Sequence, residues 1–370
     1  MSVYLDHNAT SPAPQSVIDA VAHAMTVVGN ASAQHAHGRA AAALVADARE
    51  SVGLAMCQCA QDIVFTGSGT EAINTAIHSA VSNGCRHLLV SSLDHPASIM
   101  AAEASGARVT LLPATPSGQT DLDALAAILR DWDDADGRPF LSMVAANSET
   151  GVIQNTDPAI DLVQDVGGLV LIDAVQVLGK GPMLYPADYV AVSAHKIGGP
   201  QGVGALYVSP DAPFTPLIHG GGQEQRRRAG TLNVPGIAGF GAAARDASER
   251  FSGLAPLRDA LQAELTAIDP GIVMFGADDA RLPNTLFFSA PGLRAMTAMM
   301  RFDLAGLSVS TGTACSSGKV GESRALRAMG RIEDAPDGAV RVSFGPGNTM
   351  NDVEAFANAW ADLRKAKKAA

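Results

Sequence analysis

At residues 189–200 the chain reads Tyr189-Val190-Ala191-Val192-Ser193-Ala194-His195-Lys196-Ile197-Gly198-Gly199-Pro200. Its first four residues predict a buried strand, whereas the glycines and the proline at its end predict a turn. Most lysines that follow a strand are merely solvated. Lys196 can instead form a Schiff base with a carbonyl compound if burial or neighbouring cations favour its neutral amine. Ser193 and His195 can both donate hydrogen bonds to a phosphate on the same ligand.

Six further apolar runs have the same strand character, and helical patterns such as 71–81 and 121–129 lie between most of them. These runs are residues 63–65, 87–90, 108–112, 140–144, 169–172 and 203–208. Strands that are apolar along nearly their whole length are covered on both faces, and strands that alternate with helices form parallel sheets. The sequence therefore predicts an α/β fold with a mostly parallel, seven-stranded sheet.

The pattern changes from about Val234 onward. Two Ala-rich helical stretches span residues 234–251 and 255–267, and a final helix is expected over 351–367. Short strands are expected near residues 272–275, 285–288 and 340–344. This mixture predicts a second, smaller α+β domain.

The composition excludes several classes of protein. No run approaches the roughly 20 uncharged apolar residues of a membrane-spanning helix, and the first residues lack the basic and apolar regions of a signal peptide. We therefore expect a cytoplasmic protein without membrane contact. The net charge of −11 argues against a nucleic-acid partner. Binding a nucleic acid requires a surplus of lysine and arginine to neutralise its phosphates, and this chain has a surplus of acidic residues instead. Arg226-Arg227-Arg228 is interpreted as a solvated loop.

The chain has four cysteines, Cys57, Cys59, Cys85 and Cys315. Disulfides are improbable in a cytosolic protein of this size, and the spacing of Cys57 and Cys59 suits no common zinc site. The first three cysteines are interpreted as inert small residues, and no metal site is predicted. Cys315 lies within Ser310–Gly318, which is rich in Ser, Thr and Gly, so an exposed loop is expected. An accessible thiol that ionises is typical of a nucleophile, although a bystander remains the alternative.

Two other motifs follow predicted strands. Phe65–Glu71 has small residues that let the backbone approach a phosphate at a helix start, although an ordinary Gly-rich turn is equally compatible. It is not a Walker loop, because the Gly-Lys-Ser/Thr ending is missing. In Val170–Gln176, Asp173 lies at the carboxyl end of a buried strand, where parallel sheets place ligands. Such a carboxylate can pair with a protonated pyridine nitrogen, or it can simply cap a helix.

Taken together, these features resemble the cysteine desulfurases of the NifS/IscS type. These are class V, fold-type I enzymes that depend on pyridoxal 5′-phosphate (PLP). The resemblance covers nearly the whole chain in the family's order. The matching segments are Tyr4–Pro12, Gly29–Ser32, Gly38–Arg39, Asp94–His95, Asn147–Gly151, His219–Glu224, Arg228–Thr231, the Cys315 loop and Arg341–Gly345.

The resemblance implies the reaction and its catalytic residues. PLP-dependent removal of sulfur from L-cysteine would give L-alanine and a persulfide on Cys315, for transfer to an acceptor. Lys196 would hold PLP covalently and later move protons at Cα. His95 would stack on the ring and serve as an acid or base, and Arg341 would bind the substrate carboxylate.

The resemblance also implies how the cofactor is bound. Asp173 would pair with the pyridine nitrogen, while Asn147 and Gln176 would hydrogen-bond near the ring's 3′ oxygen. The expected phosphate ligands are Gly69, Thr70, Ser193, His195 and, from a second subunit, Thr231. The last contact implies a homodimer. A large PLP-binding domain is expected over residues 15–245, and a small domain over 1–14 with 246–370.

The sequence departs mildly from the family pattern. Ser148 stands where a second Asn is usual, Asp94 where Glu is usual and Ala229 where Ser is usual; the phosphate loop reads Thr66–Glu71 instead of Thr-Ser-Gly-Ala-Thr-Glu. From the residues after the last helical pattern we expect no extension of the kind that docks scaffold proteins in housekeeping members. The sequence therefore does not determine which protein accepts the sulfur. Iron–sulfur cluster assembly, tRNA thiolation, cofactor synthesis and DNA sulfur modification all remain compatible.

Two alternatives keep part of this interpretation. Another class V enzyme, such as an aminotransferase, a kynureninase-like hydrolase or a selenocysteine lyase, would keep Lys196, Asp173 and the phosphate site. An aminotransferase needs no thiol in a Ser/Gly loop, so Cys315 discriminates against it. A sulfur-relay component would instead present sulfur on Cys315 to partner proteins and turn over cysteine weakly without them.

Overall fold

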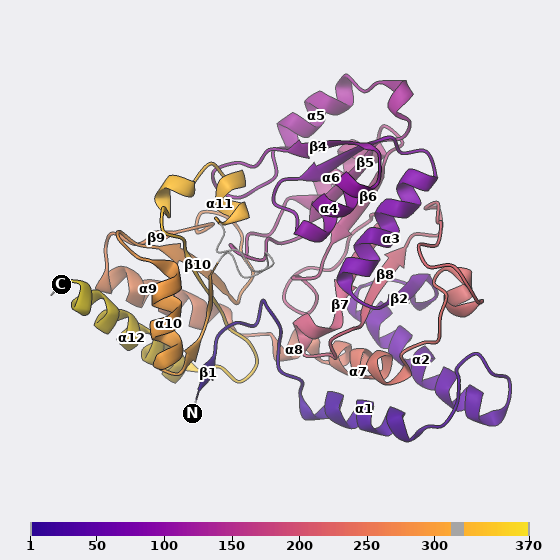
Figure 1. Ribbon diagram of the computed structural model, residues 1–370, viewed down its shortest axis with the longest axis horizontal. Helices are drawn as coiled ribbons and strands as arrows, with labels where there is room; N and C mark the ends of the chain where they lie inside the picture. The colour runs from indigo at the N-terminus through magenta and orange to yellow at the C-terminus, as the bar shows by residue number, and fades with distance from the viewer. Residues whose placement is uncertain (1, 312–321, 369–370) are drawn as a thin grey trace.

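The computed structural model describes residues 2–311 and 322–368 of the chain. Its largest element is a seven-stranded sheet with the strand order β2-β8-β7-β6-β5-β3-β4 (Figure 1). The strands are β2 (Ile63–Thr66), β3 (His87–Ser91), β4 (Arg108–Leu112), β5 (Phe140–Val144), β6 (Leu169–Asp173), β7 (Tyr189–Ser193) and β8 (Gly204–Val208). Neighbouring strands from β7 to β4 run parallel, whereas β8 is antiparallel to both of its neighbours. The predicted α/β fold with a mostly parallel sheet is confirmed.

Helices cover both faces of this sheet, which explains why every strand except the partly exposed edge strand β4 is fully buried. In β6, Leu169 and Leu171 pack with α3 (Gly69–Ser82) and α4 (Pro96–Ala104) in one buried cluster. Val170 and Ile172 point to the other face and join a second cluster. That second layer is built from α2 (Ala36–Ala55), α5 (Leu122–Arg130), α6 (Thr156–Gln164) and α7 (Val234–Arg245). Successive strand residues therefore supply two hydrophobic cores.

A second, four-stranded sheet is antiparallel and has the order β12-β13-β10-β9. Its strands are β9 (Val273–Met274), β10 (Thr285–Ser289), β12 (Ser310–Thr311) and β13 (Val340–Ser343). The accompanying helices are α9 (Ala255–Ile268), α10 (Ala295–Leu304), α11 (Arg324–Ala328) and α12 (Met350–Lys368). The helical stretch expected over 234–251 is divided at Asp246 into α7 and the short α8 (Ala247–Arg250).

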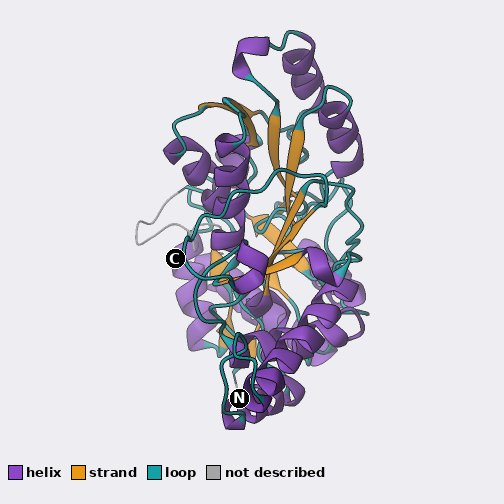
Figure 2. Cartoon of the chain, turned by 90° about the vertical axis from the view of Figure 1, so that its right-hand side faces the viewer, coloured by secondary structure: helices purple, strands orange, loops and turns teal. Residues whose placement is uncertain are grey.

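The N-terminal segment connects the two sheets. Strand β1 (Val3–Tyr4) pairs in parallel with β11 (Leu307–Ser308). The chain then crosses to the large sheet, where the Ser11 amide donates to the His195 carbonyl over 2.9 Å. It continues into α1 (Gln15–Thr26), which lies along α7 (Figures 1 and 2). Residues 5–14, here called the N-terminal arm, are thus placed beside the carboxyl ends of β6 and β7.

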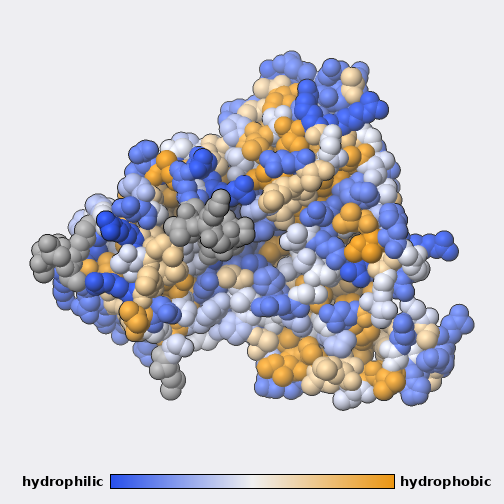
Figure 3. Space-filling model, viewed as in Figure 1, coloured by the Kyte–Doolittle hydropathy of each residue, from blue (hydrophilic) through white to orange (hydrophobic). Residues whose placement is uncertain are grey.

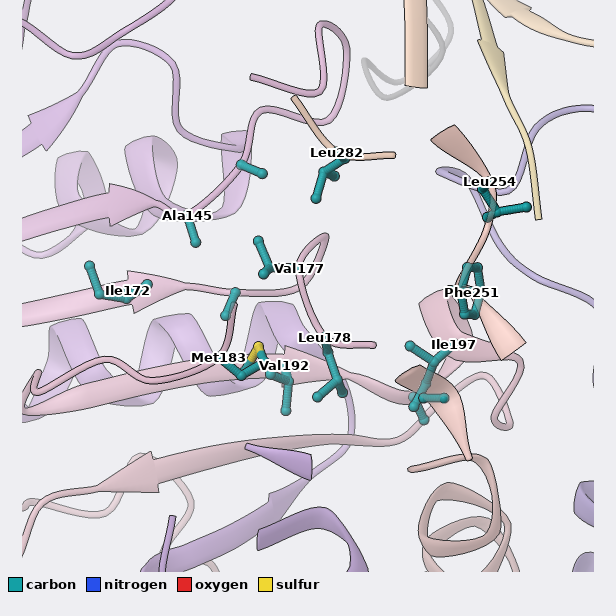
Figure 4. Packing of buried hydrophobic residues seen from close by; sticks show 14 of the residues in the cluster. Ala145, Ile172, Val177, Leu178, Met183, Val192, Ile197, Phe251, Leu254 and Leu282 are labelled. Atoms are coloured by element: carbon teal, nitrogen blue, oxygen red, sulfur yellow. The ribbon is translucent and has the colours of Figure 1, made fainter. Parts of the chain in front are cut away.

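The larger hydrophobic cluster extends from the sheet toward the C-terminal half of the chain. Figure 4 shows Ile172 and Val192 on the strands, Val177 and Ile197 on the turns that follow them, and Phe251 beyond. The two sheets therefore share continuous buried packing, which fixes the turns after β6 and β7 in place.

The surface is mixed in character. On the face shown in Figure 3, hydrophobic residues are interspersed with hydrophilic ones.

Within the described part of the chain, no helix is long and apolar enough to cross a membrane. Cys85 is buried, whereas Cys57 and Cys59 are exposed, and residues 2–311 and 322–368 contain no cluster of His, Cys, Asp and Glu suited to a metal ion.

Candidate active site

A cavity of about 520 Å³ lies at the carboxyl ends of β6 and β7. The sequence-predicted residues that line it are Gly69, Thr70, His95, Asp173, Gln176, Ser193, His195 and Lys196. Three other candidates, Asn147, Thr231 and Arg341, are not among the lining residues. Cys315 lies outside the described residues. The fold therefore brings together eight side chains that are dispersed over more than 120 positions of sequence.

Lys196 lies in a 3₁₀ turn, Ala194–Ile197, directly after β7. The turn ends at Gly198, whose φ of +82° lies in the left-handed region that favours glycine. A Cβ at this position would lie only 2.7 Å from the Pro12 carbonyl oxygen. The Lys196 ammonium donates to the carbonyl oxygens of Asn8 and Ala9 over 2.7 and 2.9 Å. The strand and the turn thus aim the amine at the N-terminal arm, on the wall of the cavity.

Asp173 is the last residue of β6 and is almost fully buried. One carboxylate oxygen accepts from the Val175 amide over 3.0 Å, so the residue also caps the local turn, although no helix begins there as the alternative interpretation expected. Burial raises its pKa to about 6, while the nearby Lys196 charge acts in the opposite direction. A cationic N–H group placed in the cavity beside this carboxylate would stabilise its ionised form.

The opposite part of the cavity has the features of an anion site. Ser68 is the N-cap of the 14-residue helix α3, and its hydroxyl accepts from the Glu71 amide over 3.1 Å. Gly69 packs closely against its surroundings, since a Cβ there would lie 2.9 Å from Val175 Cγ2 and 3.4 Å from Ser193 Cβ. The buried Nδ1 of His195 has no hydrogen-bond partner within the described residues. Thr70, Ser193 and His195 therefore present donors around the positive end of a helix.

His95 lies on a different wall and is the N-cap of α4. Its Nδ1 accepts from the Ala97 amide over 3.1 Å, so Nε2 carries the proton of the neutral ring. Burial lowers the pKa of His95 to about 4, and the charges of Lys196 and Arg324 act in the same direction. The ring is therefore neutral near pH 7 and can donate a proton from Nε2 or stack against a planar ligand.

Gln176 is held from two sides. Its Nε2 donates to the Asn8 carbonyl over 3.0 Å, and its Oε1 accepts from the Lys180 ammonium at 3.3 Å. The sequence interpretation missed both Lys180 and the Asn8 carbonyl. A lysine four residues after a cavity residue is a possible signal for the former, whereas a backbone carbonyl has no signal in the sequence.

Asn147 and Arg341 support the cavity wall from behind. The side-chain Oδ1 of Asn147 accepts from the backbone amides of Glu149 and Thr150, each at 3.0 Å, and its Nδ2 donates to the Leu93 carbonyl. Arg341 is buried in β13 and donates to the Ser148 carbonyl over 2.9 Å. Ser148 lines the cavity, so both residues fix the turn that carries it.

The Arg341 guanidinium also pairs with Asp6 on the N-terminal arm, over 2.7 Å. Its buried Nε has no hydrogen-bond partner within the described residues. One donor of the fork is therefore left for an additional acceptor.

Two arginines beside the anion site correct the sequence interpretation of residues 226–228. Arg226 is exposed as expected. Arg228 instead pairs with Glu71 over 2.9 Å, and Arg227 donates to the Gln61 carbonyl over 2.7 Å. The expectation of a solvated loop is wrong for these two residues, because carboxylate and carbonyl oxygens at the start of β2 and α3 accept hydrogen bonds from their guanidinium groups. Thr231, three residues further on, is exposed and is not among the residues that line the cavity of its own chain.

Glu149 marks where the chain returns to the site after residues 312–321. The carboxylate is buried and accepts from the Ser323 hydroxyl over 2.5 Å and from the Ala325 amide over 3.3 Å. These contacts join the start of α11 to the turn that carries Ser148. The segment that contains Cys315 is therefore followed by a helix attached to the cavity wall.

Comparisons with known proteins agree with this arrangement. Residues 3–356 match the family described as aminotransferase class-V. A cysteine desulfurase of Frankia sp. (strain EuIK1) is 36% identical over 96% of this chain and 90% of that protein. A cysteine desulfurase of Bradyrhizobium diazoefficiens is also 36% identical, over 98% and 94% of the two chains. The X-ray structure of a NifS-like protein from Rickettsia africae ESF-5 is 30% identical, with a TM-score of 0.90 over 99% of this chain and all of that one.

Proposed function

Because the chain belongs to the class V aminotransferase family, and within it to the NifS/IscS-type cysteine desulfurases, we propose that the cavity beside Lys196 binds PLP and desulfurates L-cysteine. The observation that carries this proposal is the convergence of Lys196 and Asp173 on one cavity, with an anion site at its other end. A lysine, a buried carboxylate and a phosphate cradle match the aldehyde, the pyridine nitrogen and the phosphate of the cofactor.

The residues around the cavity fit the cofactor. The unpartnered Nδ1 of His195 and Gly69, which has no side chain, lie beside the start of α3, where a phosphate is stabilised by the helix dipole. Thr70 and Ser193 would complete this end from the same chain. Asp173 would hold the pyridine nitrogen, whose positive charge would offset the burial that raises the pKa of this carboxylate. We also propose that Gln176 and Asn147 lie toward the ring's 3′ oxygen.

When bound, PLP supplies an electron-withdrawing ring that stabilises negative charge at the carbon bearing the substrate's amine. Lys196 would first hold the cofactor's aldehyde carbon and then, once displaced by the substrate amine, take the proton from Cα. The neutral His95 would lie against the ring and donate a proton from Nε2. Arg341 is proposed to bind the substrate carboxylate with the donor that its present contacts leave unused.

Cys315 would receive the sulfur. Its thiolate attacks the substrate sulfur, so that one S–S bond forms while the substrate's C–S bond breaks. The electron pair of the broken bond stays on the three-carbon skeleton, which takes up protons and leaves as L-alanine. The net reaction converts L-cysteine and the Cys315 thiol into L-alanine and a Cys315 persulfide, so no external oxidant is consumed.

The proposal extends to organisation and partners. We propose a cytoplasmic homodimer in which Thr231 of one chain reaches the phosphate site of the other, since Thr231 is exposed and does not line its own cavity. We further propose a large domain over 15–245 and a small domain over 1–14 with 246–370. The final sulfur acceptor is proposed to be a protein that approaches Cys315.

The decisive experiment follows alanine, sulfide and the mass of the Cys315 peptide after L-cysteine is added to the PLP-loaded protein. Alanine formation with a mass increase of one sulfur atom is expected. Both should be lost in Cys315→Ser, whereas PLP absorbance should persist. A PLP-loaded protein that forms no alanine from cysteine would contradict the proposal and indicate another class V reaction. Alanine formation only in the presence of an added protein acceptor would favour a sulfur-relay role.

A further inference from the structure

Lys180 is a buried amine that the proposed reaction does not use. The residue follows the turn after β6 and is only 6% exposed. Its ammonium lies 5.4 Å from the centre of the ring of Phe251, a core residue labelled in Figure 4. Its hydrogen-bond acceptor is the Gln176 Oε1 at 3.3 Å. No carboxylate of the described chain forms an ion pair with it.

Such a position is costly for a lysine. Burial, together with the positive charges of Lys196 and Arg341, lowers the pKa of Lys180 to about 7. A buried ammonium without a carboxylate partner is strongly disfavoured, so it is retained in few places apart from functional sites. An uncharged residue of similar volume would fill the same space without this cost.

The contacts of Lys180 lead directly to the cavity. The ammonium holds the Oε1 of Gln176, which leaves Nε2 to donate to the Asn8 carbonyl over 3.0 Å. The same carbonyl accepts from the Lys196 ammonium over 2.7 Å. Lys180, Gln176, Asn8 and Lys196 therefore form one continuous chain of hydrogen bonds, with a cation at each end.

We propose that Lys180 is a positioning residue of the active site. Its ammonium holds the Gln176 amide toward the Asn8 carbonyl, and its positive charge disfavours a second positive charge at the Lys196 nitrogen. The inference rests on the proposed function, because it assumes that Lys196 binds PLP. It adds a role for a residue that does not itself line the cavity.

The other charged and titratable groups around Lys180 support this assignment. His195 shares the Lys196 turn, His7 lies on the N-terminal arm and Arg341 on β13. Burial lowers the pKa of both histidines to about 4, so they are neutral near pH 7. The charge of Arg341 is offset by Asp6. Lys180, partly protonated near pH 7, is thus the cationic group near Lys196 that no carboxylate of the described residues balances.

Two substitutions separate the two parts of the proposal. Lys180→Gln removes the positive charge but keeps an amide that can donate to Gln176 Oε1, whereas Lys180→Met removes both. The matched control is Arg258→Met, which removes a cation of 13% side-chain exposure in α9, away from the cavity. Each protein is loaded with PLP, and two quantities are measured: the pH midpoint of the absorbance change of bound PLP and the dissociation constant of PLP.

The expected result is an upward shift of the pH midpoint by about one unit in both Lys180 variants, because removing a like charge favours protonation. The dissociation constant of PLP should rise about tenfold in Lys180→Met and stay within twofold in Lys180→Gln. Arg258→Met should change neither quantity. A wild-type midpoint in Lys180→Gln, or an equal shift in Arg258→Met, would overturn the proposal. Both readouts are independent of cysteine turnover, so a failure to form alanine would affect only the proposed function.

Discussion

The ammonium nitrogen of Lys196 lies 2.7 Å from the backbone oxygen of Asn8, on the arm that precedes the large sheet. The Ala9 carbonyl adds a second acceptor at 2.9 Å. Two carbonyls satisfy a protonated amine, and a neutral amine binds them less strongly. Proton loss at Lys196 therefore loosens its contact with the arm at the moment when the amine becomes a nucleophile.

Replacing Lys196 tests its proposed attachment to PLP. Lys196→Ala should abolish the borohydride-fixable attachment of PLP and reduce alanine formation from cysteine by about a thousandfold or more. Mass spectrometry of the reduced protein and an alanine assay measure the two effects. Lys365→Ala is the control, because the side chain of Lys365 is 79% exposed on α12. PLP fixed elsewhere in Lys196→Ala would contradict the assignment.

The charge of Asp173 can be removed without removing its structural contact. Asparagine keeps an oxygen for the Val175 amide but cannot pair ionically with a pyridine nitrogen. Asp173→Asn should therefore fold and bind PLP, while kcat falls by about 10²- to 10³-fold. Steady-state kinetics and the thermal midpoint together measure this. An unchanged kcat with normal stability would show that Asp173 acts only as a cap.

The phosphate end of the cavity depends on the absence of a side chain at Gly69. A methyl group there would lie 2.9 Å from Val175 Cγ2, so a neighbouring group must shift into the cavity. Gly69→Ala should raise the dissociation constant of PLP about tenfold, as measured by absorbance titration. Gly222→Ala provides the comparison, since a Cβ on Gly222 would meet no atom within 4 Å. Equal effects of the two substitutions would argue against a steric role for Gly69.

Asp94 makes the stability of the cofactor-free protein depend on pH. Burial raises its pKa to about 7, although the Ser142 hydroxyl and the Val144 amide donate to it over 2.8 and 2.6 Å. A raised folded-state pKa stabilises the protein below the unfolded value near 4, and this contribution is lost as the pH rises through 7. Asp94→Asn, which stays neutral, should therefore gain stability relative to the wild type between pH 5 and pH 8.

The gain expected for Asp94→Asn is on the order of 2–4 kcal/mol, since one pKa unit corresponds to about 1.4 kcal/mol. Urea unfolding of both proteins without PLP at several pH values measures it. A difference between the two proteins that does not vary with pH would contradict the raised pKa. Asp121→Asn is a suitable control, because Asp121 only caps α5.

Arg341 is expected to affect substrate binding more than turnover. Arg341→Lys keeps the charge but loses the planar fork, so the KM for L-cysteine should rise about tenfold or more while kcat changes less. Asp6→Asn removes the ion-pair partner of Arg341 but leaves the guanidinium in place. If Asp6→Asn raises KM as much as Arg341→Lys, then Arg341 serves the fold instead of the substrate carboxylate.

The sequence by itself determined the parts of the site that depend on local pattern. The apolar runs ending in Asp173 and Ser193 predicted β6 and β7, and Gly69 and Thr70 were expected at the start of α3. Because parallel strands place their carboxyl ends at one edge of a sheet, these residues had to meet in one place. The resemblance to a family added roles to positions such as His95.

Only the tertiary structure decided the contacts between distant segments. The Asn8 carbonyl reaches Lys196 across 188 residues, and Asp6 pairs with Arg341 across 335. The burial of Lys180 likewise depends on Phe251, which lies beyond the large sheet. Backbone carbonyls carry no side-chain signal, and the burial of a lysine depends on packing between segments that no local pattern encodes. The pairing of β1 with β11 and the shared core place these groups, because they fix where the N-terminal arm crosses the cavity.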